Sequence, residues 1–264
     1  MFRYILDKIA AAEFRTDPFR HLHLTGLFDE DHFQAILACR QIRLPPVADD
    51  RALIAELAAR GYAAIPFPGT TTDIEAYLAW HGSGQRQSGV NNANCEGFGI
   101  TFRLMQPEPG TMLQHLDRFL RSDAFWRTLA DKFGIDLAAV ETDSGIQKYL
   151  DGYEISPHPD VRRKALTFMV NINPAAQSEA LEYHTHYMRF RPEHEHIRHG
   201  WATDMARDRG WVSWDWCETV SQQRANNSMV IFAPSDDTLH AVRARYDHLR
   251  TQRTQCYGNL WFRR

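Results

Sequence analysis

A histidine and an aspartate lie two residues apart in the stretch DGYEISPHPDVRRKALTFMVNINP, at His158 and Asp160. Alternate residues of a strand point to the same side, so an imidazole nitrogen and a carboxylate oxygen can reach one ion from these positions. A third ligand, His240, follows the apolar run at 228–234, where a compact antiparallel fold can bring it beside the first two. Two histidines and one carboxylate suit a non-haem Fe(II) site with positions left open for a co-substrate and O₂.

Other histidines weaken this interpretation, because the chain has thirteen and a distant third ligand is almost always available. The plain alternative is two polar residues in a loop. His184 and His186 repeat the same spacing, and a charged stretch follows with His194, His196 and His199. Since neither paired cysteines nor an HExxH helix accompanies them, we interpret the last three as loop residues. His184 and His186 stay candidates for lining a pocket.

Composition and charge limit the classes of function. The chain has 264 residues, 44% hydrophobic and 24% charged, as in ordinary globular proteins. Its formal net charge is -3 and no long run of like charge occurs, so neither nucleic acid nor a membrane is an expected partner. Asp7, Lys8 and Glu13 interrupt the place of a signal peptide, so we expect a cytoplasmic protein. Reduced thiols are expected because no CxxC pair occurs among Cys39, Cys95, Cys217 and Cys256.

Helical patterns dominate the first half of the chain. Apolar spacing predicts helices at 2–14, from Asp29 onward, at 50–62, at 71–82 and at 111–135, with the last broken where Ser122 can cap a new start. A short strand is expected just before Asp29, and another at 97–105.

Strand-like pieces then follow one another, at 145–150, 165–173, 180–190, 228–234, 240–245 and 255–262. Helices first and strands afterwards predict an α+β fold, and the lack of crossover helices predicts antiparallel pairing in a sandwich or barrel. The polar segment 191–227 is interpreted as a surface excursion that its tryptophans anchor to the barrel. We expect one domain, 1–264, with a helix-rich part at 1–135 that includes a strand supporting the core, and a β core at 136–264.

Residues 147–262 resemble the core of the Fe(II)- and 2-oxoglutarate-dependent dioxygenases, in particular their prolyl-hydroxylase-like branch. That family reads Tyr-x-x-Gly, Pro-His-x-Asp, a strand with Leu-Thr that ends in Leu-Asn, an apolar strand with phenylalanine, a distal His-x-Val, an arginine and a Trp-Phe-like finish. This sequence supplies, in the same order, Tyr149, Gly152, Pro157, His158, Asp160, Leu166, Thr167, Ile172, Asn173, Phe232, His240, Val242, Arg253, Trp261 and Phe262. The resemblance implies a double-stranded β-helix, a jelly-roll and cupin-like core, with the N-terminal helices packed against it.

The resemblance also implies roles for single residues. His158, Asp160 and His240 would hold iron, and Arg253 would pair with the far carboxylate of 2-oxoglutarate, a task that suits a guanidinium fork. Arg250 is a competing candidate for that task. Relatives that halogenate lack the carboxylate that Asp160 supplies, so its presence favours hydroxylation.

Further residues are expected around the co-substrate and the substrate. Tyr149, by its family position, and Gln255, by strand alternation from Arg253, are candidate partners of 2-oxoglutarate. Arg103 is a charged residue on an apolar strand, which either pairs with a structural acid or binds an anionic group of the substrate. The substrate candidates are Arg103, Asn171, His184 and His186.

The resemblance implies hydroxylation of an unactivated C–H bond, with release of succinate and CO₂. We favour a polar small molecule or carbohydrate as substrate, because the 191–227 excursion can cover the pocket. The alternatives are a prolyl-type protein hydroxylase, a non-catalytic cupin-like binding or sensing module, and a zinc hydrolase that uses an activated water. The sequence leaves the oligomeric state open, a homodimer included.

Overall fold

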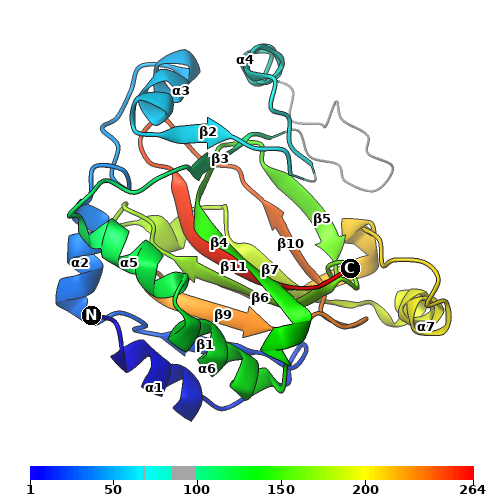
Figure 1. Ribbon diagram of the computed structural model, residues 1–264. Helices are drawn as coiled ribbons and strands as arrows, with labels where there is room; N and C mark the ends of the chain where they lie inside the picture. The colour runs from blue at the N-terminus through cyan, green and yellow to red at the C-terminus, as the bar shows by residue number, and fades with distance from the viewer. Residues whose placement is uncertain (68, 85–98) are drawn as a thin grey trace.

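Two antiparallel sheets form the centre of the computed structural model, which describes residues 1–67, 69–84 and 99–264 (Figure 1). The large sheet consists of β1 (Leu22–Thr25), β2 (Tyr62–Ala64), β3 (Thr101–Leu104), β4 (Val140–Tyr149), β6 (Lys164–Asn171), β9 (Ser228–Phe232) and β11 (Arg253–Phe262). Their order is β1-β9-β6-β11-β4-β3-β2. The predicted α+β class and antiparallel pairing are therefore confirmed.

The small sheet has four strands, β5 (Glu154–His158), β7 (Thr185–Phe190), β8 (Cys217–Gln222) and β10 (His240–Arg243). Their order is β5-β10-β7-β8, again with antiparallel neighbours. From β4 to β7 the chain alternates between the large and the small sheet, and it alternates again from β8 to β11. Neither sheet closes into a barrel among the described residues.

Helices are concentrated in the first half of the chain, as predicted. They are α1 (Tyr4–Ala11), α2 (Glu30–Ala38), α3 (Asp50–Ala59), α4 (Ile74–Gly82), α5 (Met112–Leu120), α6 (Asp123–Phe133) and the later α7 (Glu195–Thr203). The break predicted at Ser122 is confirmed, because its side chain accepts a hydrogen bond from the Phe125 backbone N–H and opens α6. Gly134 closes α6 in the left-handed conformation, at φ 70°.

One face of the large sheet is covered by helices (Figure 1). Phe125 and Trp126 of α6 lie against Phe168 of β6, with ring centroids 5.4 and 5.8 Å apart. Gly258 of β11 permits this approach, because a Cβ atom there would overlap the Phe168 ring. The helix layer buries this face, and the residues on the opposite face of β4 and β11 line a cavity.

The 191–227 segment differs from the prediction. It contains α7 and also β8, the edge strand of the small sheet, so it is more than a surface excursion. Two of its tryptophans anchor it as expected: Trp201 packs on Phe190, and the Trp214 indole N–H donates to Glu154 Oε1 at 2.8 Å.

Other boundaries differ as well. The strand expected from residue 180 begins at Thr185, after a 3-10 turn at Ser178–Ala180. Strand β2 was not predicted. The first two residues of the strand predicted at 97–105 lie outside the described residues. Cys95 also lies outside them. The other three cysteines are free.

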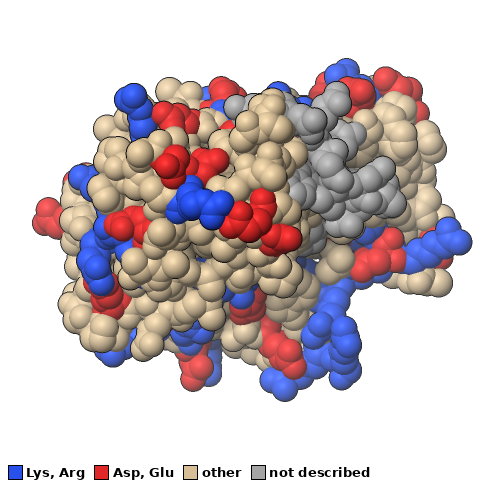
Figure 2. All heavy atoms as spheres, turned by 90° about the horizontal axis from the view of Figure 1, so that it is seen from above, with Lys and Arg blue, Asp and Glu red and all other residues tan. Residues whose placement is uncertain are grey.

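The outer surface carries mixed charge. Acidic and basic side chains are interspersed over most of the face that Figure 2 presents. Within the described ranges, none of the helices has both the length and the apolar character that a membrane span requires.

Candidate metal site and co-substrate pocket

His158 and His240 are brought together by strand pairing. His158 ends β5, His240 begins β10, and the two residues are register partners with ring centroids 4.3 Å apart. Asp160 lies beyond the end of β5, so the sequence argument from strand alternation was wrong. Its backbone is left-handed, with φ 65°, a conformation that aspartate tolerates better than most residues.

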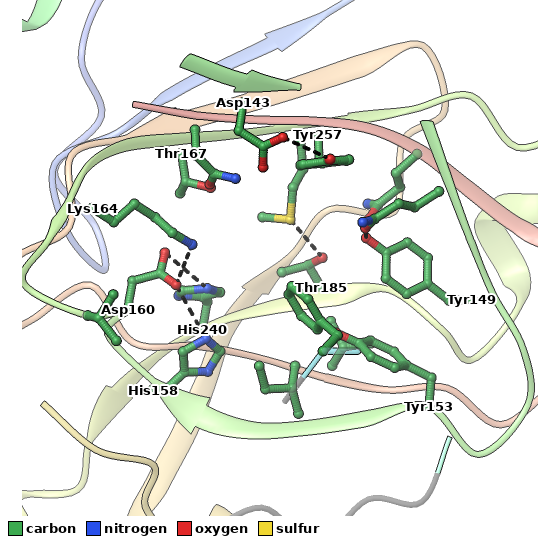
Figure 3. Close-up of a pocket in the computed structure, with 18 of the residues that line it drawn as sticks. Asp143, Tyr149, Tyr153, His158, Asp160, Lys164, Thr167, Thr185, His240 and Tyr257 are labelled. Atoms are coloured by element: carbon green, nitrogen blue, oxygen red, sulfur yellow. Dashed lines mark hydrogen bonds and ion pairs between the residues drawn. The ribbon is translucent and has the colours of Figure 1, made fainter. Parts of the chain in front are cut away.

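The three side chains converge in a buried cluster (Figure 3). The Nε2 atom of His158 lies 3.6 Å from Asp160 Oδ1, and that of His240 lies 3.8 Å from Oδ2. All three residues are less than a tenth exposed. One ligand atom from each lies within 4.8 Å of the others, so the cluster can hold a metal ion.

Backbone carbonyls fix both rings in the tautomer that a metal requires. His158 Nδ1 lies 2.8 Å from the Ser156 carbonyl, and His240 Nδ1 lies 3.0 Å from the Thr238 carbonyl. Each Nδ1–H donates to its carbonyl, which leaves the Nε2 lone pair facing the centre. Burial, followed by the neighbouring His158, lowers the pKa of His240 to about 3, so its ring is neutral at ordinary pH.

Asp160 supplies the acidic ligand. Its Oδ1 accepts a hydrogen bond from Lys164 Nζ at 2.7 Å, whereas Oδ2 is buried without a hydrogen-bond partner among the described residues. Burial acts to raise the pKa of Asp160, but the Lys164 charge and the two histidines outweigh it and hold the pKa well below its usual value. An ionised, buried and unpartnered oxygen beside two Nε2 lone pairs fits a divalent metal with nitrogen and oxygen ligands.

A cavity of about 310 Å³ adjoins this cluster and is lined by Arg253 and Tyr149. Arg253 is 2% exposed, donates from Nη2 to Thr185 Oγ1 at 2.9 Å, and has its guanidinium 4.5 Å from the Tyr149 ring centroid. Arg250 lies outside the cavity, with its side chain 80% exposed and paired to Asp247 at 3.1 Å. The structure thus brings the first candidate arginine to the pocket and leaves the second at the surface.

Tyr149 and Gln255 both line the cavity, as expected, and each also contacts a neighbouring amide. The Tyr149 hydroxyl donates to Gln147 Oε1 at 2.7 Å. Gln255 Nε2 donates to Asn171 Oδ1 at 2.7 Å, while Gln255 Oε1 is buried without a partner in the described part of the chain. Asn171 itself donates to the Gln223 carbonyl and lies behind the cavity wall. It supports Gln255 rather than lining the cavity.

Arg103 lines the cavity, with its guanidinium 4.8 Å from the Tyr257 ring centroid. Its Nε atom is buried without a hydrogen-bond partner among the described residues. Within the described ranges, no acid forms an ion pair with Arg103, so the structural partner that the sequence allowed for is not found there.

His184 and His186 do not line the cavity, contrary to the sequence-based expectation. His184 lies just before β7, and its Nε2 contacts the Ser178 carbonyl at 3.1 Å. His186 lies between Thr219 Oγ1, at 2.9 Å from its Nδ1, and the ring of Trp214. The expectation failed because Thr185, which lies between them, faces the cavity, so alternation turns His184 and His186 away from it.

The histidines at 194–199 also differ from the prediction, because they belong to a 3-10 turn and to α7 rather than to a loop.

Sequence reasoning missed several residues of the cavity wall. Lys164 contacts Asp160, and Asp143 accepts a hydrogen bond through Oδ1 from the Tyr257 hydroxyl at 3.2 Å (Figure 3). Arg209 and Trp211 come from the excursion, whose irregular backbone gives no periodic signal. In the sequence, the four-residue spacing from Asp160 to Lys164 was the one available sign that Lys164 could contact Asp160.

A second polar cluster lies away from this cavity. His81 of α4 contacts Asp50 through Nδ1 and Asp151 through Nε2, the latter at 2.9 Å. His248 Nε2 lies 2.7 Å from Asp50 Oδ1, and His248 Nδ1 accepts the Asp151 backbone N–H at 2.8 Å. The hydrogen bond to Asp151, together with the charges of both acids, raises the pKa of His81. This cluster joins α3 and α4 to the loops that follow β4 and β10.

Comparisons with known proteins give structural neighbours only, since no family model and no curated protein matches the chain. A Pseudomonas putida prolyl-4-hydroxylase is 12% identical over 100% of both chains, with a TM-score of 0.43. The epimerase SnoN, in complex with Fe³⁺, α-ketoglutarate and nogalamycin RO, is 12% identical over 98% of this chain and 84% of its own, with a TM-score of 0.47. An oxidoreductase of the 2OG-Fe(II) oxygenase family from Burkholderia pseudomallei is 12% identical over 83% and 93%, with a TM-score of 0.31.

Proposed function

We propose that this chain is a non-haem Fe(II)- and 2-oxoglutarate-dependent dioxygenase that hydroxylates a C–H bond of a small molecule. One observation carries the proposal. Two Nε2 lone pairs and an unpartnered carboxylate oxygen converge on one buried point, and the same cavity holds the buried guanidinium of Arg253. His158, Asp160 and His240 are the iron ligands in this proposal.

The strand order supports a jelly-roll core of the double-stranded β-helix type. Strands β4 to β11 form two sets of four, β9-β6-β11-β4 and β5-β10-β7-β8. The chain passes between the sets in the manner of paired Greek keys. In such a core the ends of β5 and β10 meet, so both histidine ligands come from rigid strands, and Asp160 follows shortly after β5.

Arg253 is the residue that we assign to the far carboxylate of 2-oxoglutarate. Its fork is already directed by Thr185 Oγ1 and by the ring of Tyr149, so little side-chain freedom is lost when the carboxylate binds. Gln255 and Tyr149 line the same cavity. The exposed position of Arg250, outside the cavity, supports the assignment of Arg253.

When bound, iron would supply the redox chemistry by which O₂ converts 2-oxoglutarate to succinate and CO₂ and the substrate C–H to C–OH. The protein's own residues prepare the site. Ser156 and Thr238 carbonyls hold the two imidazoles in one tautomer, and Lys164 orients the Asp160 carboxylate. Aromatic side chains of the cavity wall, Tyr153, Trp211 and Trp261 among them, limit the access of water.

The size of the cavity supports a small substrate. About 310 Å³ is at the lower end of the range for ligand pockets, so co-substrate and the reacting part of a substrate fill it. We prefer a polar small molecule or carbohydrate over a protein side chain because the 191–227 segment, which can cover the pocket, contributes to its lining. The excursion, through Arg209 and Trp211, contributes to the wall that such a substrate meets.

The first experiment is to purify the protein without oxygen and add Fe(II) and 2-oxoglutarate. We expect a weak visible charge-transfer band that requires both additions, and we expect it to weaken in Asp160→Ala and in Arg253→Ala. Succinate release on addition of O₂ then provides the assay for substrates. A protein that forms no band and retains zinc would instead favour a hydrolase, and one that binds no metal would favour a binding module.

A further inference from the structure

Two side chains of the excursion enter the cavity beside the metal cluster. Arg209 and Trp211 both line it, and the Trp211 ring centroid lies 6.1 Å from that of His158. The Val212 backbone N–H donates to the Pro157 carbonyl at 2.9 Å, which fastens this segment to β5. The donors are therefore held by the same strand that supplies His158.

Both side chains have a buried donor that is not used. Arg209 Nε and Trp211 Nε1 have no hydrogen-bond partner within the described residues. Buried polar groups are nearly always paired, so an unused donor in a cavity wall marks the position of an acceptor on a ligand or on water. Two such donors, two residues apart, favour a group with several acceptor atoms.

The charge of Arg209 is also poorly compensated. Its side chain is only 4% exposed, yet its nearest acid is Asp236, at 3.6 Å. Asp236 is partly exposed and lies 3.5 Å from Arg162 as well, so two guanidinium groups share one carboxylate. The negative charges of Asp208 and Asp160 also act on Arg209. Asp208 accepts the Arg209 backbone N–H and forms no ion pair with the guanidinium among the described residues, and in the proposed function Asp160 binds iron. A buried guanidinium without a full partner favours binding of an anion.

The cavity as a whole has an excess of positive charge. In the proposed holoenzyme the charges of iron, 2-oxoglutarate, Asp160 and Arg253 sum to zero. Among the described residues of the lining, the charged ones that remain are three cations, Arg103, Lys164 and Arg209, and one acid, Asp143. Complementary charge thus requires an anionic substrate rather than a neutral or cationic one.

We propose that the substrate has an anionic group, a carboxylate or a phosphate, that pairs with Arg209 and accepts the indole N–H of Trp211. The proposal rests on the proposed function for the identity of the reaction, since it assigns the substrate of the same site. Because Trp211 packs against His158, the carbon that is oxidised lies only a few bonds from this anionic group.

Calorimetry with small probes tests the binding site without relying on turnover. The probes are phenylacetate against phenylacetamide, and phenyl phosphate against phenol, because the cavity wall is aromatic. We expect at least one anion to bind the protein, loaded with Fe(II) and 2-oxoglutarate without oxygen, about tenfold or more tightly than its neutral counterpart. The anion that binds more tightly, phenylacetate or phenyl phosphate, distinguishes a carboxylate substrate from a phosphate substrate.

Variants assign the effect to single residues. Arg209→Gln should remove the preference for the anion, and Trp211→Phe, which keeps the aromatic ring but loses the N–H, should weaken anion binding by roughly threefold to tenfold. Arg207→Gln is the matched control, because Arg207 belongs to the same segment and is 87% exposed. It should bind as the wild type does. A midpoint temperature of thermal unfolding for Arg209→Gln at or above that of the wild type verifies that its fold is intact.

Three results would overturn the proposal. The first is equal binding of anion and neutral probe by the wild type, and the second is a preference that survives Arg209→Gln but is lost in Arg103→Gln. The third is a rise in the 2-oxoglutarate requirement of Arg209→Gln with unchanged probe binding, which would make Arg209 a co-substrate residue. If no charge-transfer band forms but apo protein still prefers the anions through Arg209, the proposed function fails and the anion site stands.

Discussion

Replacing Arg253 with alanine is the sharpest test of the co-substrate site. The guanidinium is buried, and the carboxylate that it is proposed to bind would accept two charge-assisted hydrogen bonds from it. Each such bond is worth about 1.5–3 kcal/mol, so their loss should cost roughly 3–6 kcal/mol of binding free energy. The concentration of 2-oxoglutarate at half-saturation should therefore rise by roughly two to four orders of magnitude.

The assay is a titration of the Fe(II)-loaded protein with 2-oxoglutarate in the absence of oxygen, followed by the charge-transfer band. Iron content should stay at the wild-type level, because Arg253 contacts Thr185 and Tyr149 and no member of the metal cluster. Arg250→Ala is the control, since its side chain is exposed, and it should titrate as the wild type does. The assignment would be refuted if Arg253→Ala and wild type reached half-saturation at the same 2-oxoglutarate concentration, or if that concentration rose only in Arg250→Ala.

Three further outcomes are expected. His240→Ala should lose most of its bound iron by metal analysis, whereas His186→Ala should retain it, and equal losses would make His186 a ligand. His81 has a raised pKa in the folded state, so its contribution to the free energy of unfolding is fully present below about pH 6.5 and is lost as pH rises through the folded pKa. Denaturant unfolding of wild type and His81→Gln should therefore give a stability difference that shrinks as pH rises. A difference that grows with pH would contradict this. Gly258→Ala should destabilise the fold by about 1–3 kcal/mol because its Cβ overlaps Phe168, while Gly210→Ala, in open space, should stay within about 0.5 kcal/mol.

The sequence was informative where local chemistry and periodicity coincide. Ser122 followed by Asp123 is a capping pattern that needs no tertiary context, and the structure uses it as predicted. The helix cap depends on neighbours within a few positions in the chain. The order of polar residues from Tyr149 to Arg253 was instead recognised by its resemblance to the dioxygenase core.

Strand β8 was hidden because it is an edge strand with most of its residues at least partly exposed. Its sequence, CETVSQ, has apolar residues only at Cys217 and Val220, three positions apart, so no alternation of apolar residues marked it. The error over His186 has a different cause. The pattern of β7 did not indicate which of its two faces lies toward the cavity, and Thr185 faces it, so His186 points the other way.

The His81 cluster could not have been predicted from local pattern at all. Asp50 and His248 are neighbours in space through a contact that spans most of the chain, and each is an ordinary polar residue in its own segment. Such contacts follow from the packing of α3 and α4 against the loops of the sheets. A single sequence contains no local signal for them.

Residues 191–216, the part of the excursion that carries Arg209 and Trp211, leave the small sheet at the end of β7 and re-enter it at the start of β8, at neighbouring positions. Phe190 and Cys217 are register partners on β7 and β8, and the Arg191 backbone N–H donates to the Trp216 carbonyl at 2.9 Å. Because the ends are already joined by the ladder, the segment between them can change in length and sequence at small entropic cost. Selectivity in such a protein can therefore diverge by exchange of one inserted loop, while the strands that hold the metal ligands stay the same.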